Sequence, residues 1–155
     1  MTVAVNSEIH FGAEFVSDSW SEALPLMKAH WDEIEQYKEI PLDPDFEIYK
    51  KLDEAQVLRV FTARDSESKL VGYCVYIVQV NPLTKGITMA NQNALFVKKE
   101  NRGFGKKFIA WCDDMLRKEG INFVYHHVSP QHDYSPILRR LGYKSSYQVY
   151  SRRLV

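Results

Sequence analysis

The sequence predicts one α/β domain with a mixed sheet, spanning residues 1–155. Runs rich in β-forming residues alternate along the chain with amphipathic helical patterns, as in folds that pack helices on a sheet. The length is near that of one domain, and no internal repeat, low-complexity tract or linker divides the chain. Hydrophobic residues make up 45% of the chain and aromatic residues 13%, which is typical of a globular protein.

The N-terminal third predicts one strand followed by two helices. Loosely alternating apolar residues predict a strand over 8–15. Apolar residues at helical intervals then predict a helix from Ser19, which has the spacing of a capping box with Glu22. Asp43 followed by Pro44 is typical of a helix start and predicts a second, short helix.

The middle of the chain predicts a hairpin and then a strand that leads into a helix. Two β-rich runs, 56–63 and 70–80, are joined by a polar stretch that suits a hairpin. A short apolar strand over 93–97 passes through a glycine-containing turn into an amphipathic helix, which ends at Gly120.

The C-terminal part predicts two further strands around a short helix. The strands are expected over 121–128 and 147–154, and the helix over 135–141. Strands and helices are therefore interleaved along the whole chain.

Charge and cysteine content exclude several classes of protein. Twenty basic and twenty acidic residues cancel, so no overall field draws the protein to nucleic acid or to an anionic membrane. Cys74 and Cys112 lie far apart in apolar runs, which argues against a disulfide framework. We find no apolar core of a signal peptide and no run of about 18 apolar residues. We expect a cytoplasmic protein without a nucleic-acid or membrane partner.

The turn around Arg102-Gly103-Phe104-Gly105 is a candidate anion site. A glycine turn between a strand and a helix places free N–H groups at the positive end of the helix dipole. Lys106 and Lys107 add positive charge. No Gly-Lys-Ser/Thr follows the glycines, and Phe108 stands where a dinucleotide fingerprint needs a third glycine. The turn is thus neither a Walker loop nor a Rossmann turn.

With this turn the sequence resembles the GCN5-related N-acetyltransferase family, whose pyrophosphate loop has the pattern Arg/Gln-x-x-Gly-x-Gly/Ala. Arg102 and Gly105 match its Arg and first Gly, while Lys107 departs from the expected small residue. A second register places Glu100, Gly103 and Gly105 on the pattern and replaces the basic residue with an acid; we prefer the first. Downstream, the segment 137–143, Ile-Leu-Arg-Arg-Leu-Gly-Tyr, is similar to the closing helix of the family.

The resemblance implies a mostly antiparallel twisted sheet with a splayed parallel pair, flanked by helices. It implies that acetyl-coenzyme A (acetyl-CoA) donates an acetyl group, without a metal, to an amine that attacks directly in a ternary complex. The acceptor would be a small-molecule or peptide amine, and a homodimer is compatible with the sequence. The residues expected to contact the coenzyme are Leu95, Phe96, Val97, Arg102, Gly103, Phe104, Gly105, Lys106 and Lys107.

The resemblance does not assign the general acid and the general base as clearly as it assigns the residues that contact the coenzyme. The usual tyrosine acid of the family corresponds to Leu138, so Tyr134 is the nearest substitute. A histidine suits the role of base, because it titrates near neutral pH. Strand alternation places His126 and His127 on opposite faces, and we favour His127, while Asn93 is expected to hold a water. The histidines that compete for the role of base are His126, His127 and His132.

Two other functions remain open from the sequence. A relative that binds coenzyme A without turnover would explain the missing tyrosine acid. A nucleic-acid module would use the lysines and Arg102 around the glycine turn as a phosphate patch, but the balanced charge and the lack of interleaved aromatic residues oppose it.

Overall fold

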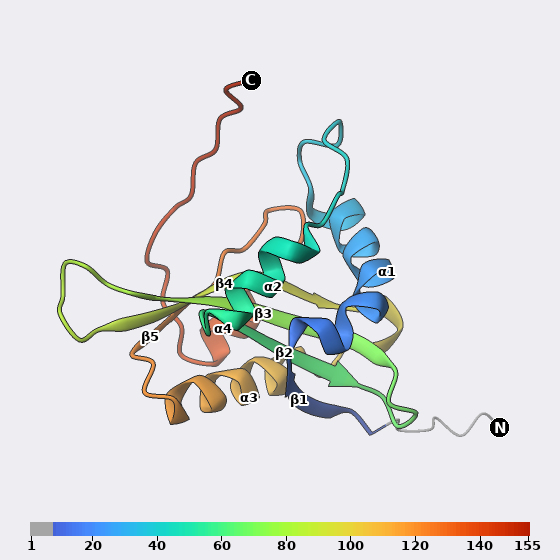
Figure 1. The fold of residues 1–155 in the computed structure, drawn as a ribbon, viewed down its shortest axis with the longest axis horizontal. Coiled ribbons are helices and arrows are strands. Elements are labelled where there is room, and N and C mark those ends of the chain that lie inside the picture. The colour runs from blue at the N-terminus through green and yellow to red at the C-terminus, as the bar shows by residue number, and fades with distance from the viewer. Residues whose placement is uncertain (1–7) are drawn as a thin grey trace.

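The computed structural model describes residues 8–155 and shows a five-stranded sheet with helices on both faces (Figure 1). The strand order is β1-β2-β3-β4-β5, and all neighbours are antiparallel except β4 and β5, which are parallel. The prediction of a mixed fold with a mostly antiparallel sheet and one parallel pair is confirmed. The elements are β1 (His10–Glu14), α1 (Val16–Ile34), α2 (Phe46–Glu54), β2 (Leu58–Arg64), β3 (Leu70–Val80), β4 (Thr88–Val97), η1 (Lys99–Asn101), α3 (Gly105–Lys118), β5 (Phe123–Tyr125) and α4 (Ser135–Arg140).

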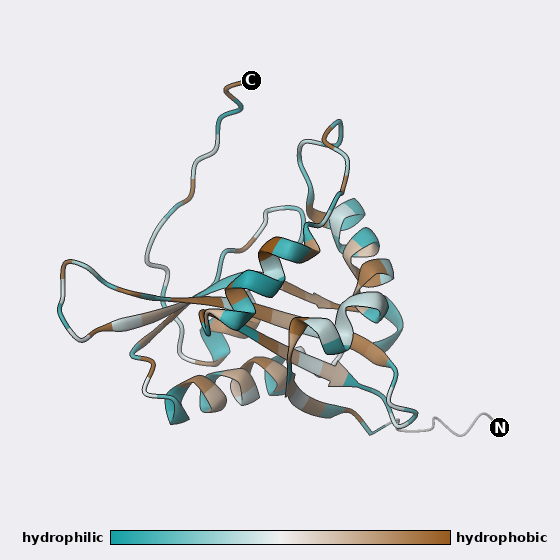
Figure 2. Ribbon diagram, in the orientation of Figure 1, coloured by the Kyte–Doolittle hydropathy of each residue, from teal (hydrophilic) through white to brown (hydrophobic). Residues whose placement is uncertain are grey.

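The hydrophobic core has one layer on each face of the sheet. Successive side chains of a strand point to opposite faces, so β2 directs Phe61 toward α3 and Val60 toward α1 and α2. On the first face, Phe108 and Cys112 of α3 are completely buried against the strands. In Figure 2 the strands at the centre of the sheet are coloured mainly brown, which marks hydrophobic residues. Within residues 8–155 no helix is both long and apolar enough to cross a lipid bilayer.

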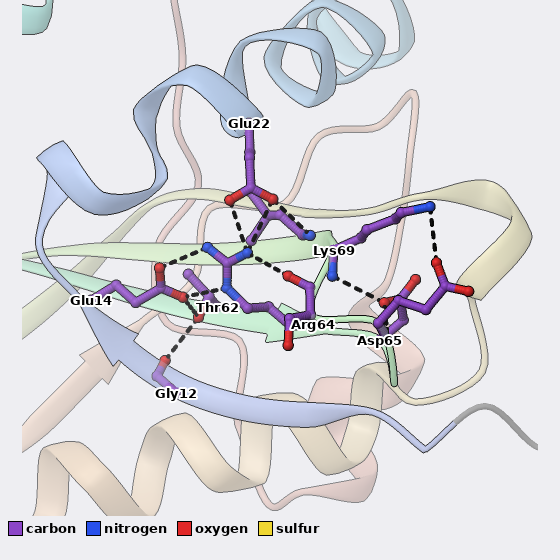
Figure 3. A network of polar contacts seen from close by, with 10 residues as sticks. Gly12, Glu14, Glu22, Thr62, Arg64, Asp65 and Lys69 are labelled. Carbon is purple, nitrogen blue, oxygen red and sulfur yellow. Dashed lines mark hydrogen bonds and ion pairs between the residues drawn. The ribbon is translucent and has the colours of Figure 1, made fainter.

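A network of polar contacts ties α1 to the first two strands. The Arg64 guanidinium of β2 donates to Glu14 of β1 and to Glu22 of α1, and both ion pairs have N–O distances of 2.8–2.9 Å (Figure 3). Thr62 also donates to the Glu14 carboxylate. The hydrogen bonds to Arg64 lower the pKa of Glu14, so its charge is stabilised in the fold.

The structure corrects both predicted helix starts. Helix α1 begins at Val16, whose N–H donates to the Asp53 carboxylate of α2 at 2.7 Å. Ser19 is therefore buried inside the helix, and the predicted capping box is wrong. Helix α2 begins after Asp45, whose side chain accepts a hydrogen bond from the N–H of Ile48. Contacts between distant segments thus set the start of α1, which a local capping pattern does not describe.

The predicted C-terminal strand is also wrong. Residues 144–155 contain no strand, and side chains such as Tyr147 and Tyr150 are 78% and 87% exposed. The segment runs along the surface, where the Ser151 hydroxyl accepts a hydrogen bond from Gln36. Within the described residues no strand pairs with this segment, although the Tyr147 ring centre lies 6.0 Å from that of Tyr125 in β5. Strand β4, in contrast, starts at Thr88, several residues earlier than predicted.

Candidate active site

The predicted glycine turn joins the end of β4 to the start of α3. Gly103 has a φ of 132°, a conformation that side-chain-bearing residues rarely adopt, and Gly105 is the first residue of α3. The N–H groups of Gly105, Lys106 and Lys107 belong to the first helical turn and have no acceptor within the helix. Lys106 and Lys107 are exposed. The turn therefore offers unpaired donors and positive charge to an anion.

Arg102 is held in place by three contacts. Its Nε donates to the carbonyl oxygen of Val97 at 3.0 Å, and its terminal nitrogen donates to Glu33 of α1 at 2.7 Å. The guanidinium also lies 5.7 Å from the centre of the Phe96 ring. The hydrogen bond from Arg102 lowers the pKa of Glu33, so the pair is ionised at neutral pH. Arg102 links the turn to α1 as well as supplying charge.

Strands β4 and β5 separate after a short parallel pairing. The pairing covers Met89 to Asn91, and in the described residues no strand pairs with the outer edge of β4 beyond it. Gln92 lies at this fork, and its side-chain oxygen accepts a hydrogen bond from the N–H of His127 at 3.0 Å. Leu95, Phe96 and Val97 follow on the open edge. Their outward peptide groups can bind an extended ligand, as an additional strand would.

A bulge in β4 lies next to the fork. Val75 of β3 faces Ala94, whereas Tyr76 faces Gln92, so Asn93 is the extra residue. The Asn93 side-chain oxygen accepts a hydrogen bond from the Tyr49 hydroxyl of α2 at 3.2 Å. This contact fixes the Asn93 amide at the point where the strand edge becomes open.

Tyr134 belongs to a chain of polar side chains behind the fork. The His126 ring lies 2.9 Å from the Tyr134 hydroxyl through Nδ1 and 3.1 Å from the Tyr76 hydroxyl through Nε2. Burial lowers the pKa of His126 to about 4 and raises the pKa of Tyr134. At neutral pH the imidazole is neutral and the phenol protonated, so the hydroxyl can act as a proton donor.

The His127 side chain is exposed. Strand β5 ends at Tyr125, before both histidines, so the predicted strand over 121–128 is shorter than expected and strand alternation does not apply to them; His126 is the more buried of the two. Leu138, which occupies the position of the usual tyrosine, is buried in α4. His132 lies 3.4 Å from Glu33 of α1. Within residues 8–155 no group of three potential metal ligands occurs.

A cavity of about 460 Å3 lies between α1, the loop from α1 to α2, and strands β2 to β4. Trp20 and Trp31 line it from α1, and Val60 and Val75 line it from the sheet. The cavity reaches the β4 bulge at Asn93. A ligand in this cavity would therefore meet the open edge of β4.

His30 and Tyr73 form a buried polar pair in the wall of this cavity. The His30 Nδ1 lies 3.0 Å from the Tyr73 hydroxyl, and the imidazole stacks on Phe96. Burial lowers the pKa of His30 to about 4, so the ring is neutral and can accept a proton only weakly. Sequence patterns alone do not single out His30 or Tyr73, because the contact between them forms only when α1 packs against β3. The position of His30 on the apolar face of α1, one turn after Met27, was the available signal.

The comparisons with known proteins agree with this geometry at the level of fold. No protein-family model matches the chain, and no curated protein matches its sequence. Many solved structures do match. An aminoglycoside acetyltransferase from an uncultured soil metagenomic sample, in complex with sisomicin, is 22% identical with a TM-score of 0.70, over 96% of this chain and 95% of that chain.

Two other solved structures extend the comparison. The acetyltransferase AAC(6')-Iy, in complex with a bisubstrate analogue that contains CoA, is 17% identical with a TM-score of 0.70, over 96% of this chain and 99% of that chain. The glucosamine-6-phosphate N-acetyltransferase of Arabidopsis thaliana is 13% identical with a TM-score of 0.70 and the same coverage. The chain therefore has the fold of the GCN5-related N-acetyltransferases over nearly its full length.

Proposed function

We propose that this protein transfers an acetyl group from acetyl-CoA to an amine. One observation carries the proposal: the cavity between α1 and the sheet is lined by Asn93, at the bulge where β4 is no longer paired with β5, and the same strand leads into the glycine turn. A donor bound along β4 and an acceptor in the cavity would meet at the bulge. Bringing two reactants together in this way removes much of the entropic barrier to their reaction.

The residues present fit coenzyme A. Its pyrophosphate suits the free N–H groups of residues 103–107, where the Gly103 position has open space for a close approach. Its pantetheine amides suit the open peptide groups of Leu95 to Val97. When bound, acetyl-CoA supplies a thioester whose carbonyl carbon an amine attacks directly, giving an N-acetylated product and free coenzyme A.

The side chains around the bulge remove the proton of the amine and supply the proton of the leaving group. Asn93, held by Tyr49, positions a water that relays the proton of the attacking amine to a base. Tyr134 gives its proton to the departing thiolate and is reprotonated from solvent, while His126 holds its hydroxyl. His30 and His127 are the two candidate acceptors of the amine proton. Separate His30→Gln and His127→Gln variants distinguish them, because the true acceptor controls the rising limb of the pH profile.

A thermal-shift titration with acetyl-CoA tests the coenzyme site. Gly105→Glu places a carboxylate where the phosphate would bind. Gly105→Ala is the matched control, because in both variants the new Cβ lies 3.6 Å from Ile137, an ordinary contact distance, and only the glutamate adds a charge. At a hundredfold excess over Kd, the wild type and Gly105→Ala should gain about 2.7 kcal/mol, whereas Gly105→Glu should gain none. An equal response of all three proteins, or no response, would show that the coenzyme does not bind at this turn.

Release of thiol in the presence of amines tests the transfer step. The wild type should release coenzyme A in proportion to acceptor amine, and Tyr134→Phe should retain binding of acetyl-CoA but lose most of the release. Binding of acetyl-CoA without release by any amine would instead favour a catalytically inactive coenzyme-binding protein. Salt-dependent binding of oligonucleotides that acetyl-CoA does not displace would favour a nucleic-acid module.

A further inference from the structure

The cavity between α1 and the sheet has a chemistry that selects among amines. Most of its lining is apolar, with aromatic faces from Trp20 and Trp31 and aliphatic side chains from the strands. Trp20 is itself fixed by tilted contacts with Phe46 and Tyr49 of α2, at 5.0 and 5.7 Å between ring centres. A fixed indole wall favours a flat apolar group, because little side-chain freedom is lost when the group binds.

The charges at the cavity are negative. Asp43 and Asp45 line its mouth from the loop between α1 and α2, and both residues are exposed. In the described part of the chain, no lysine or arginine lines the cavity, and the one histidine, His30, is neutral when buried. Carboxylates at the mouth attract a cation, and the aromatic faces behind them stabilise it further.

The polar groups deeper in the cavity are few, and most of them already have partners. The Tyr49 hydroxyl donates to Asn93, and the Tyr73 hydroxyl pairs with His30. A sugar with many hydroxyl groups would leave most of them without partners, at a cost of about 1–3 kcal/mol for each buried group. A phosphate would meet Asp43 and Asp45 without a basic partner. The cavity therefore differs in chemistry from what an aminoglycoside or a sugar phosphate requires.

We propose that this cavity binds an arylalkylamine, a primary amine joined by a short chain to a flat apolar ring. The ring packs between the indoles and the strand side chains, and the amine reaches the bulge at Asn93. Asp43 and Asp45 draw the protonated amine to the mouth before it enters. This inference rests on the proposed function for the reaction, but the selectivity of the cavity can be measured without coenzyme.

Binding of four amines to the protein without coenzyme tests the inference. The probes are 2-phenylethylamine, ethylamine, glucosamine 6-phosphate and kanamycin, and the readouts are calorimetry and the change in tryptophan fluorescence. We expect 2-phenylethylamine to bind at least about tenfold more tightly than ethylamine, because moving its apolar ring from water into the cavity is favourable. Equal or tighter binding of kanamycin or the sugar phosphate, or no binding of 2-phenylethylamine, would overturn the inference.

Two pairs of variants locate the binding site. Ala23→Leu fills the cavity from α1, whereas Ala29→Leu places the same side chain on the exposed side of that helix. Only Ala23→Leu should weaken binding of 2-phenylethylamine, by about tenfold or more. Asp43→Asn should weaken binding of the amine at low salt, and Glu47→Gln on nearby α2 should not. Unchanged binding in both Ala23→Leu and Asp43→Asn would show that the amine binds elsewhere.

The outcomes separate this inference from the proposed function. If acetyl-CoA stabilises the protein through Gly105 but 2-phenylethylamine neither binds nor is acetylated, the inference about the acceptor is wrong and the proposed function stands. If 2-phenylethylamine binds in the cavity but acetyl-CoA does not bind, the cavity is selective as inferred and the proposed function fails.

Discussion

Replacing Arg64 should show how strongly the polar network of Figure 3 fastens α1 to the sheet. Arg64→Met keeps much of the side-chain length but leaves the Glu14 carboxylate without its main partner. The Arg64 and Glu14 side chains are 21% and 19% exposed, so the pair lies between a surface ion pair and a buried one. We expect a loss of about 3 kcal/mol in the free energy of unfolding at neutral pH. For a chain of this size, that corresponds to a decrease in Tm of about 6–12 °C.

The effect should depend on pH in a defined direction. The folded-state pKa of Glu14 is lowered from its usual 4.5, mainly by the hydrogen bond from Arg64. Its contribution is therefore fully present above pH 4.5 and is lost as the pH falls through the folded-state pKa. The difference in stability between wild type and Arg64→Met should shrink over that window.

Guanidinium denaturation followed by circular dichroism, at neutral pH and at several values below 4.5, measures this difference. Arg59→Met is the matched control on the same strand, because its partner Glu119 is 40% exposed and the pair should contribute less than about 1 kcal/mol. Equal losses for the two variants, or a loss for Arg64→Met that persists unchanged in acid, would refute the reasoning.

Four single residues elsewhere in the chain give further expected outcomes. Gly103→Ala should cost about 1 kcal/mol of unfolding free energy, measured in urea, because its φ of 132° strains any side chain. Tyr134→Phe should slow thiol release about a hundredfold at saturating substrates, while Tyr125→Phe should not. The pKa of His126 is lowered from 6.5 to about 4. The free energy of unfolding should therefore fall by about 3 kcal/mol as the pH decreases from 6.5 to 4, and this decrease should be smaller in His126→Gln. Burial raises the pKa of Cys112, so a thiol reagent should modify it only after unfolding.

The parts of the fold that sequence patterns predicted well are those with strong local signals. The prediction of a strand over residues 70–80 matches β3, and the predicted amphipathic helix matches α3, which buries Phe108 and Cys112 in the core. Local patterns did not predict the bounds of elements that depend on contacts between distant segments. Asp53 caps α1 from another helix, and the polar residues Asn91 and Gln92 belong to β4 only because β3 and β5 pair with it.

The candidate site likewise has a part that local sequence patterns predict and a part that depends on distant contacts. The glycine turn could be located because glycines and a following amphipathic helix are adjacent in sequence. The pairs of Tyr49 with Asn93 and of His30 with Tyr73 could not, because the members lie more than forty residues apart. The sequence places Tyr134 near the position of the missing tyrosine, but its contact with His126 depends on the fold.

Helix α1 is fastened near both ends, by Glu22 to Arg64 of β2 and by Glu33 to Arg102 of the glycine turn. Between these two contacts the same helix forms a wall of the cavity that reaches the β4 bulge. A phosphate that draws Arg102 away from Glu33 would release the second fastening and change the wall that an amine meets. By thermodynamic reciprocity, an amine that tightens this wall would change the affinity of the turn for phosphate by the same factor. The ion pair between Glu33 and Arg102 would thus couple the two sites. The coupling can be measured as the change in affinity for one ligand when the other is bound.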